Sequence, residues 1–234
     1  MTLLKISRMI ELSHPIHPAI PQWQGDPPVE FIPHTDIETA GYFLRAFSMG
    51  EHSATHLNAP ASFVPGGRSV DEIPAHQLLL PVVVIHAVHP ASENGDFALS
   101  LEDLMAWEHQ HGTIPTGTLV LLHTGWSRFW DTPQRYFGWD ENRIPHFPGF
   151  DTECARFLMT RRKVAGLGCD TPGVEPARDI TFSVNRCIAE QNGLALENLT
   201  NLHELPPTGA WVLIGRLALV GGSGSPACVL GLLP

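Results

Sequence analysis

The chain has 234 residues, of which 43% are hydrophobic and 16% charged, so it is long and apolar enough to bury a large core. Its formal net charge is −10, and no segment is rich in lysine or arginine. Because nucleic acids and anionic membranes bind clustered basic side chains, we expect neither kind of partner. No linker interrupts the sequence, which predicts a single domain over residues 1–234.

The four cysteines are widely spaced and lie among apolar residues, which predicts reduced core thiols and neither a zinc ribbon nor a disulfide framework. The first ten residues contain no apolar stretch of signal-peptide length, and no run of 18 apolar residues occurs elsewhere. We therefore expect a cytoplasmic protein. Its 21 prolines and 21 glycines separate the apolar runs and predict a fold rich in loops.

Short apolar segments near the N-terminus are separated by Pro-, Gly- and His-rich turns, which is typical of short strands. These segments are residues 9–12, 29–32 and 42–44. Between the first two, residues 21–26 surround Trp23 with turn-forming residues. This pattern predicts a surface loop that holds the Trp23 ring over a bound molecule, with an ordinary packed tryptophan as an equal alternative.

Longer elements follow in the rest of the chain. Apolar runs predict buried strands at residues 78–85, 119–123 and 164–168. Ser100 and Asp103 resemble a capping box that begins a helix through about His111. Further helices are predicted at residues 151–159 and 183–191, and C-terminal strands at residues 211–215, 217–220 and 227–230 around a flexible glycine-rich turn. This alternation predicts a mixed α/β fold.

Thirteen histidines are many for this length, and most stand alone. The isolated ones are expected on the surface or hydrogen-bonded in the core: His14, His17, His76, His86, His89, His109, His111, His146 and His203. His52 and His56 differ because they lie four residues apart, just before Asn58 and Pro60. Four residues of straight strand span about 13 Å. The two imidazoles therefore reach one metal ion only if the chain bends between them, with the Asn58 oxygen as a further ligand.

Residues 52–63 read His-Ser-Ala-Thr-His-Leu-Asn-Ala-Pro-Ala-Ser-Phe and resemble the motif H-x-G-T-H-x-D-x-P-x-H-F of the putative-cyclase family, which includes kynurenine formamidase. Residues 21–26 resemble the family's P-x-W-P-G-D, and residues 123–127 its R-T-G-W-S. Further matches are residues 168–172, 197–202 and 224–226. The resemblance implies a mixed α+β swivelling-type domain, with a central sheet or barrel and flanking helices, that assembles as a homo-dimer or homo-tetramer.

In that family, the motif's first two histidines and its aspartate bind Zn²⁺ or Mn²⁺, together with a later histidine and a glutamate twelve residues after it. Carried onto this chain, the resemblance implies metal ligands at His52, His56, Asn58, Asn185 and Glu197. Asparagine replaces the aspartate at position 58 and the later histidine at position 185. Because an amide binds metal only through a neutral carbonyl oxygen, these changes predict one divalent ion, Zn²⁺ or Mn²⁺, where two are possible in the family.

Ser62 stands where the family has its catalytic acid/base histidine, and a serine hydroxyl does not titrate near neutral pH. Ser62 and Glu197 are the predicted catalytic positions, with Glu197 as the best remaining base toward a metal-bound water. The structural alternative for Glu197 is that it orients a nearby loop. Trp23, Phe63 and Trp126 are predicted to bind substrate, since flat aromatic faces suit an aromatic or cyclic molecule.

These features predict a metal-dependent hydrolase, or the reverse cyclase, that acts on a C–N or C–O bond of a small cyclic amide, lactone or formamide. Kynurenine formamidase itself is less favoured, because Ser62 replaces the histidine that this activity uses. The alternative is a non-hydrolytic member of the family: a metal-dependent lyase or isomerase, or a small-molecule-binding protein. Both asparagines can still ligate or hydrogen-bond, which favours a retuned site.

Overall fold

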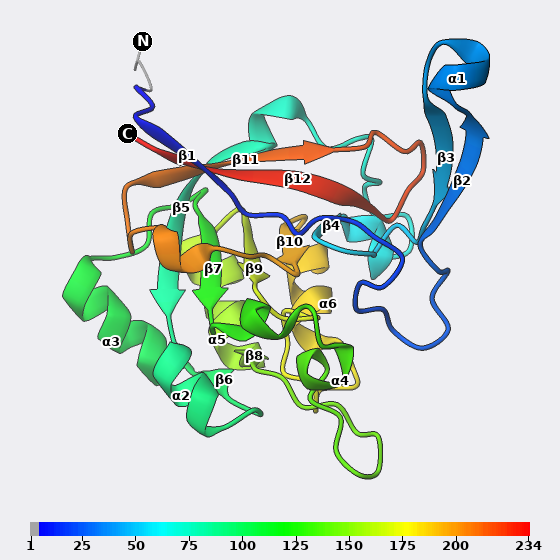
Figure 1. The fold of residues 1–234 in the computed structure, drawn as a ribbon. Coiled ribbons are helices and arrows are strands. Elements are labelled where there is room, and N and C mark those ends of the chain that lie inside the picture. Colours follow the sequence, from blue (N-terminus) through cyan, green and yellow to red (C-terminus); the bar gives the residue numbers. More distant parts are fainter. Residues whose placement is uncertain (1–4) are drawn as a thin grey trace.

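The computed structural model describes residues 5–234, and its centre is a sheet that closes on itself (Figure 1). The strand order is β1-β12-β11-β5-β7-β9-β10-β4, and β4 pairs again with β12 to complete a barrel-like ring. The strands are β1 (Arg8–Glu11), β4 (His56–Asn58), β5 (Leu79–His86), β7 (Leu119–His123), β9 (Gly166–Cys169), β10 (Leu194–Glu197), β11 (Ala210–Arg216) and β12 (Gly224–Leu233). Strands β5, β7, β9 and β10 are parallel, and the other pairings are antiparallel. The predicted mixed α/β fold with a central barrel is confirmed.

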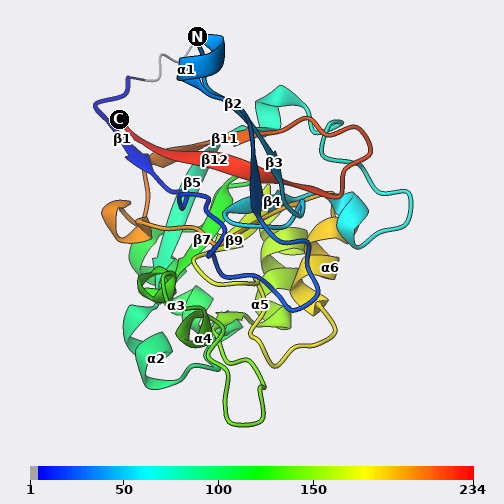
Figure 2. The same cartoon turned by 45° about the vertical axis from the view of Figure 1, so that its right-hand side comes forward.

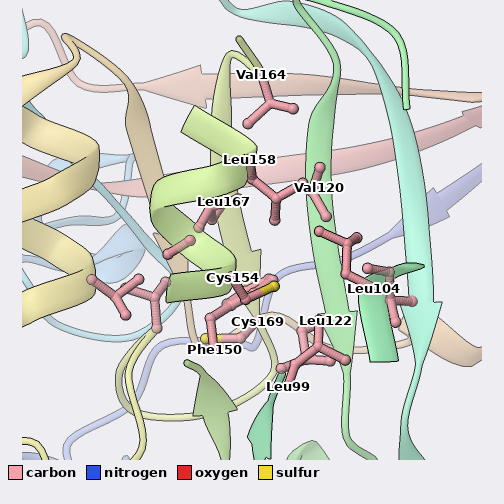
Figure 3. Close-up of a cluster of buried hydrophobic side chains, with 14 of the residues drawn as sticks. Leu99, Leu104, Val120, Leu122, Phe150, Cys154, Leu158, Val164, Leu167 and Cys169 are labelled. Carbon is pink, nitrogen blue, oxygen red and sulfur yellow. The ribbon is translucent and has the colours of Figure 1, made fainter. Parts of the chain in front are cut away.

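Alternate residues of the parallel strands serve two separate cores. Along β5, Val82 and Val84 belong to the core inside the ring, whereas Val83 and Ile85 belong to the core between the sheet and the helices. Figure 3 shows part of the second core, with Leu104, Val120 and Cys154 meeting between strand and helix. Successive strand side chains point to opposite faces, so a strand covered on both faces needs a continuous apolar run.

The longer helices cover the outer face of the parallel strands (Figures 1 and 2). The helices are α2 (Val88–Glu93), α3 (Leu101–His111), α4 (Pro133–Tyr136), α5 (Thr152–Phe157), which continues as a π-helical turn (Leu158–Arg162), and α6 (Ser183–Glu190). Two short strands, β6 (Ala98–Leu99) and β8 (Gly149–Phe150), pair beside them. No helix in residues 5–234 is long and apolar enough to cross a membrane.

A two-stranded ribbon projects from the body of the molecule and is here called the arm (Figure 1). It consists of β2 (Glu30–Thr35), the short helix α1 (Ile37–Ala40) and β3 (Leu44–Ser48). Its large apolar side chains are between 45% and 64% exposed: Ile32, Ile37, Tyr42, Phe43, Leu44 and Phe47. A two-stranded ribbon alone is marginally stable in water, so this exposed apolar surface needs an explanation.

Two local predictions were wrong. Residues 217–220 do not form a strand: the chain turns there through Gly221, which has a φ of 74°, and Val220 is 92% exposed. Part of the predicted glycine-rich turn is instead the start of β12, where Gly224 pairs with Asn58. Cys154 and Cys169 are buried thiols as predicted, but Cys228 is exposed.

The capping box at the start of α3 is confirmed and gives a stability prediction. Ser100 Oγ accepts a hydrogen bond from Asp103 N, and the Asp103 carboxylate accepts one from Ser100 N. We expect Ser100→Ala to lower the free energy of unfolding by about 1 kcal/mol, because an N–H group of the first turn loses its partner. Urea denaturation measures the effect. Ser100→Thr retains the capping oxygen and should lose much less; equal losses in both variants would contradict the capping role.

Candidate functional site

The motif segment bends as the shared-site prediction requires. Ala54 adopts the left-handed conformation with a φ of 57°, so His52 lies in a loop while His56 begins strand β4. Strand β4 pairs with β10 on one edge, where His56 lies opposite Glu197, and with β12 on the other, where Asn58 lies opposite Gly224. The barrel closure therefore brings residues of the motif beside residues that are far away in the sequence.

His56 is fixed at one ring nitrogen and unpaired at the other. Its Nδ1 donates a hydrogen bond to the Ala54 carbonyl at 2.9 Å. Its Nε2 is buried, lies 3.1 Å from Oε2 of Glu197, and has no partner in hydrogen-bonding geometry. A backbone carbonyl on one imidazole nitrogen commonly orients the other toward a metal ion.

A chain of hydrogen bonds crosses the rest of the site. His52 Nδ1 is 2.7 Å from Asn58 Oδ1, and Asn58 Nδ2 donates to Asn185 Oδ1 at 3.2 Å. Asn185 Nδ2 then donates to one carboxylate oxygen of Glu175 at 2.9 Å and one of Glu197 at 3.0 Å. Each amide thus has its oxygen and its nitrogen satisfied by a different neighbour.

The two buried glutamates differ in their pKa values. Burial, and after it the nearby Glu197 charge, raise the pKa of Glu175 to about 7, against hydrogen bonds from Asn185. Burial would also raise the pKa of Glu197, but the adjacent His56 imidazole, the hydrogen bond from Asn185 and the nearby His52 outweigh burial and lower that pKa. Neighbouring carboxyls with separated pKa values are typical of acid/base sites, one holding a proton and the other a charge.

The donor set that could face a divalent cation is smaller than the five predicted ligands. Within residues 5–234, no three His, Cys, Asp or Glu side chains converge to hold an ion by themselves. The unpaired His56 Nε2 and the Glu197 carboxylate do face each other. Amide oxygens of Asn58 and Asn185 are the remaining neutral donors. His52 fits poorly as a ligand, because both of its ring nitrogens already have partners. Nδ1 is 2.7 Å from Asn58 Oδ1, and Nε2 is 2.9 Å from Ser223 Oγ.

These residues line a cavity of about 580 Å³, a volume suited to a small molecule. The lining residues include those predicted from the motif and several that were not: Trp23, Asp26, His52, His56, Asn58, Ser62, Phe63, Pro145, Phe147, Pro172, Gly173, Glu175, Pro176, Ala177, Asp179, Ile180, Phe182, Asn185, Glu197 and Ser223. Trp23 packs on Phe137 and Phe147, and Phe63 pairs with Phe182 across 5.7 Å. The cavity is therefore lined by aromatic rings as well as by polar groups.

Trp126 lies elsewhere, in a buried aromatic cluster with Trp130 and Tyr136. Its indole Nε1 donates to the Tyr136 carbonyl at 2.7 Å, and its backbone N–H donates to Asp170. This anchoring replaces the predicted role of Trp126 in substrate binding. Asp170 is fully buried and accepts two further hydrogen bonds from Thr124, so its role is structural.

Two of the cavity residues that the sequence did not predict, Glu175 and Ser223, contact the predicted site residues. Glu175 lies between a glycine-containing segment and Pro176, and only its position three residues after the matched segment 168–172 pointed to it. Ser223 lies in the segment that was predicted as a flexible turn, where a serine carries no signal of its own. Ser62, at the family's catalytic position, lines the cavity and donates to the Ser223 carbonyl at 2.6 Å.

The raised pKa of Glu175 predicts a specific pH dependence of stability. A carboxyl that binds its proton more tightly in the folded state stabilises the fold below its ordinary pKa of 4.5, and this contribution is lost as the pH rises through about 7. We expect Glu175→Gln to remove part of the stability loss between pH 5 and pH 8, measured by chemical denaturation. The exposed Glu190→Gln should leave the slope unchanged. An identical slope in wild type and Glu175→Gln would contradict the pKa shift.

The sequence is similar to those of two kinds of known enzymes. The chain is 28% identical over 221 residues to isatin hydrolase of Roseibium aggregatum, covering 90% of this chain and 83% of the relative. It is 24% identical over 226 residues to kynurenine formamidase of Bacillus cytotoxicus, covering 95% and 96%. Both relatives are named as hydrolases.

Solved structures agree with this relationship. Isatin hydrolase A from Ralstonia solanacearum superposes with a TM-score of 0.89 at 34% identity, covering 97% of this chain and 92% of that one. An isatin hydrolase bound to the product analogue thioisatinate gives a TM-score of 0.91 at 26% identity, covering 97% and 92%. A sequence profile described as "Putative cyclase" matches residues 10–176, so the chain belongs to the putative-cyclase family.

Proposed function

We propose that the protein hydrolyses a C–N bond of a small cyclic amide or a formamide, with one divalent metal ion, Zn²⁺ or Mn²⁺, in the site. The observation that carries the proposal is the unpaired, buried His56 Nε2 facing the Glu197 carboxylate at 3.1 Å on the wall of the cavity. Relatives named isatin hydrolase and kynurenine formamidase support the substrate class. A lactone, in which a C–O bond would be hydrolysed, is the alternative substrate.

The cavity supports recognition of a flat, partly apolar molecule. Trp23 and Phe147 lie edge to face, with ring centroids 5.9 Å apart, and Phe63 and Phe182 form a second aromatic pair. Such rings contribute apolar area with few rotatable bonds and pack well against a planar substrate. The polar groups of the site lie on the same cavity, so a bound ring can present a carbonyl to them.

His56 and Glu197 would hold the ion, with the Asn58 and Asn185 oxygens as neutral donors. When bound there, a divalent ion would polarise a carbonyl oxygen and would lower the pKa of a water molecule. Glu197, whose pKa is lowered, keeps its charge at neutral pH and can accept a proton from water. Glu175 has a pKa of about 7 and can hold a proton beside it.

The proposal is tested with protein purified without chelator. We expect about one Zn²⁺ or Mn²⁺ per chain by elemental analysis, and turnover of isatin, N-formylkynurenine or a simple lactone. His56→Ala and Glu197→Gln should each lower kcat/KM by about 100-fold or more, because each removes a ligand or the base.

The exposed His109→Ala on α3 serves as the control and should keep wild-type activity. Full turnover in Glu197→Gln would rule out this glutamate as the base. Tight binding of an aromatic acid with no turnover of any of these substrates would favour a binding protein over a hydrolase.

We also propose that the protein assembles as a homo-oligomer and that a second copy covers the arm. The arm exposes six large apolar side chains on a two-stranded ribbon, which rarely persists alone in water. If half of each side chain were covered, the arm would bury on the order of 600 Å², a large part of the roughly 800 Å² per partner that a stable interface needs.

The double substitution of Phe43→Ser and Phe47→Ser should shift the protein toward the monomer, because it removes two of the six large exposed apolar side chains of the arm. Sedimentation velocity measures the mass of the species in solution. The control is Val220→Ser, since Val220 is also apolar and is 92% exposed but lies away from the arm. Wild-type protein that sediments as a monomer would contradict the proposal.

A further inference from the structure

Three histidines outside the cavity come together where strands β5 and β7 end. His86 is the last residue of β5 and His123 the last of β7, and the two are partners in the parallel pairing (Figure 1). Their Nδ1 atoms are 2.8 Å apart, and their rings are nearly perpendicular, with centroids 5.1 Å apart. The ring of His203, in the short turn Leu202–Glu204, lies 6.3 Å from that of His123. None of the three histidines lines the cavity of the candidate site.

The separations of these rings fit ligands of one metal ion. An imidazole nitrogen binds a divalent transition metal at about 2.0–2.1 Å, so two such nitrogens on one ion lie about 3 Å apart and their ring centroids about 5 to 6 Å apart. His86 and His123 already have these separations. Within residues 5–234 no third His, Cys, Asp or Glu converges with them, but His203 is exposed and its side chain can turn toward the pair.

A buried carboxylate beside the pair adds a negative charge. Asp170 is fully buried, and its carboxylate oxygens accept hydrogen bonds from Thr124 and Trp126. It forms no ion pair with any side chain of the described part of the chain. Burial lowers the pKa of His123, and the charge of Asp170 opposes this effect, as it also does at His86. A cation at the imidazole pair would therefore be attracted by a charge that no other group neutralises.

We propose that His86 and His123 bind a divalent transition-metal ion that prefers nitrogen ligands, such as Ni²⁺, Cu²⁺ or Zn²⁺, with His203 as the third ligand. Imidazole is a favoured ligand of these ions, whereas Mg²⁺ and Mn²⁺ favour oxygen. Water completes the coordination, because His86 and His203 are exposed to solvent. This site is separate from the ion that the proposed function places in the cavity, so either can be present without the other.

A metal ion at this site joins three segments of the chain: the ends of β5 and β7 and the turn of residues 202–204. Because these ligands are far apart in the unfolded chain, the free energy of binding stabilises the folded state. Residues 123–127 resemble a family segment that begins with arginine. A guanidinium donates hydrogen bonds and has no lone pair for a metal, so His123 gives this chain a ligand that the resemblance does not imply.

Calorimetric titration with Ni²⁺ tests the site in full-length His56→Ala protein, which lacks the imidazole ligand of the cavity. We expect about one Ni²⁺ per chain. Adding His86→Gln or His123→Arg should weaken binding by about 100-fold, because each removes one of the two imidazoles in contact. The matched control is His89→Ala, since His89 is exposed and lies 3.6 Å from Glu93 in another possible surface chelate. Unchanged Ni²⁺ binding in both ligand variants would overturn the proposal.

Thermal unfolding in the same His56→Ala background supplies a second measurement. Without metal, adding His86→Gln should leave the Tm nearly unchanged, because His86 is exposed, and this shows that the variant folds. Ni²⁺ at about 100 times its Kd should raise the Tm by about 5 °C or more when His86 is present. It should have little effect on the His86→Gln protein. An equal rise in both proteins would contradict the proposed ligands.

Discussion

Strand β4 is hydrogen-bonded on both of its edges, to β10 and to β12, and the chemistry of the molecule depends on this double pairing. The strand has only three residues, His56, Leu57 and Asn58. Leu57 points into the core of the ring, so the residues on either side of it turn toward the cavity. A slip of one residue would exchange these faces and remove both polar side chains from the site.

The same pairing explains why the site can hold several polar groups in a buried place. Glu197 reaches His56 from β10, and Ser223 reaches His52 from the turn before β12. Buried amides and carboxylates are costly unless each donor and acceptor has a partner. Asn185 meets this condition by joining Asn58 to the two glutamates, which accept its N–H bonds. The charge of Glu197 is therefore supported by donors on several sides.

The sequence predicted those parts of the fold that depend on local pattern. Apolar runs located β5 and β7, and Ser100 with Asp103 located the start of α3. A metal ion shared by His52 and His56 would require a bend between them, and Ala54 provides that bend.

What the sequence could not predict depends on contacts between distant residues. The orientation of the His52 ring depends on a contact with Ser223, which lies 171 positions away in the sequence. Trp126 was assigned to the pocket because its motif neighbours matched, but hydrogen bonds to Tyr136 and Asp170 hold it in the core. The pKa of Glu175 depends mainly on burial, and the spacing of residues in the sequence does not show how deeply a side chain is buried.

The three departures from the family motif have a common physical consequence. Asn58 and Asn185 replace two ionisable metal ligands with groups that both donate and accept, so a directional hydrogen-bond chain can run where metal bonds would otherwise fix the geometry. Ser62 replaces a titrating histidine with a hydroxyl that anchors the backbone of Ser223. Asn58 contacts His52, Asn185 contacts Asn58 and the two glutamates, and Ser62 contacts the backbone of Ser223. Random loss of function would not be expected to give all three new side chains hydrogen-bond partners in the site, which supports a retuned site whose fold and cavity have been kept.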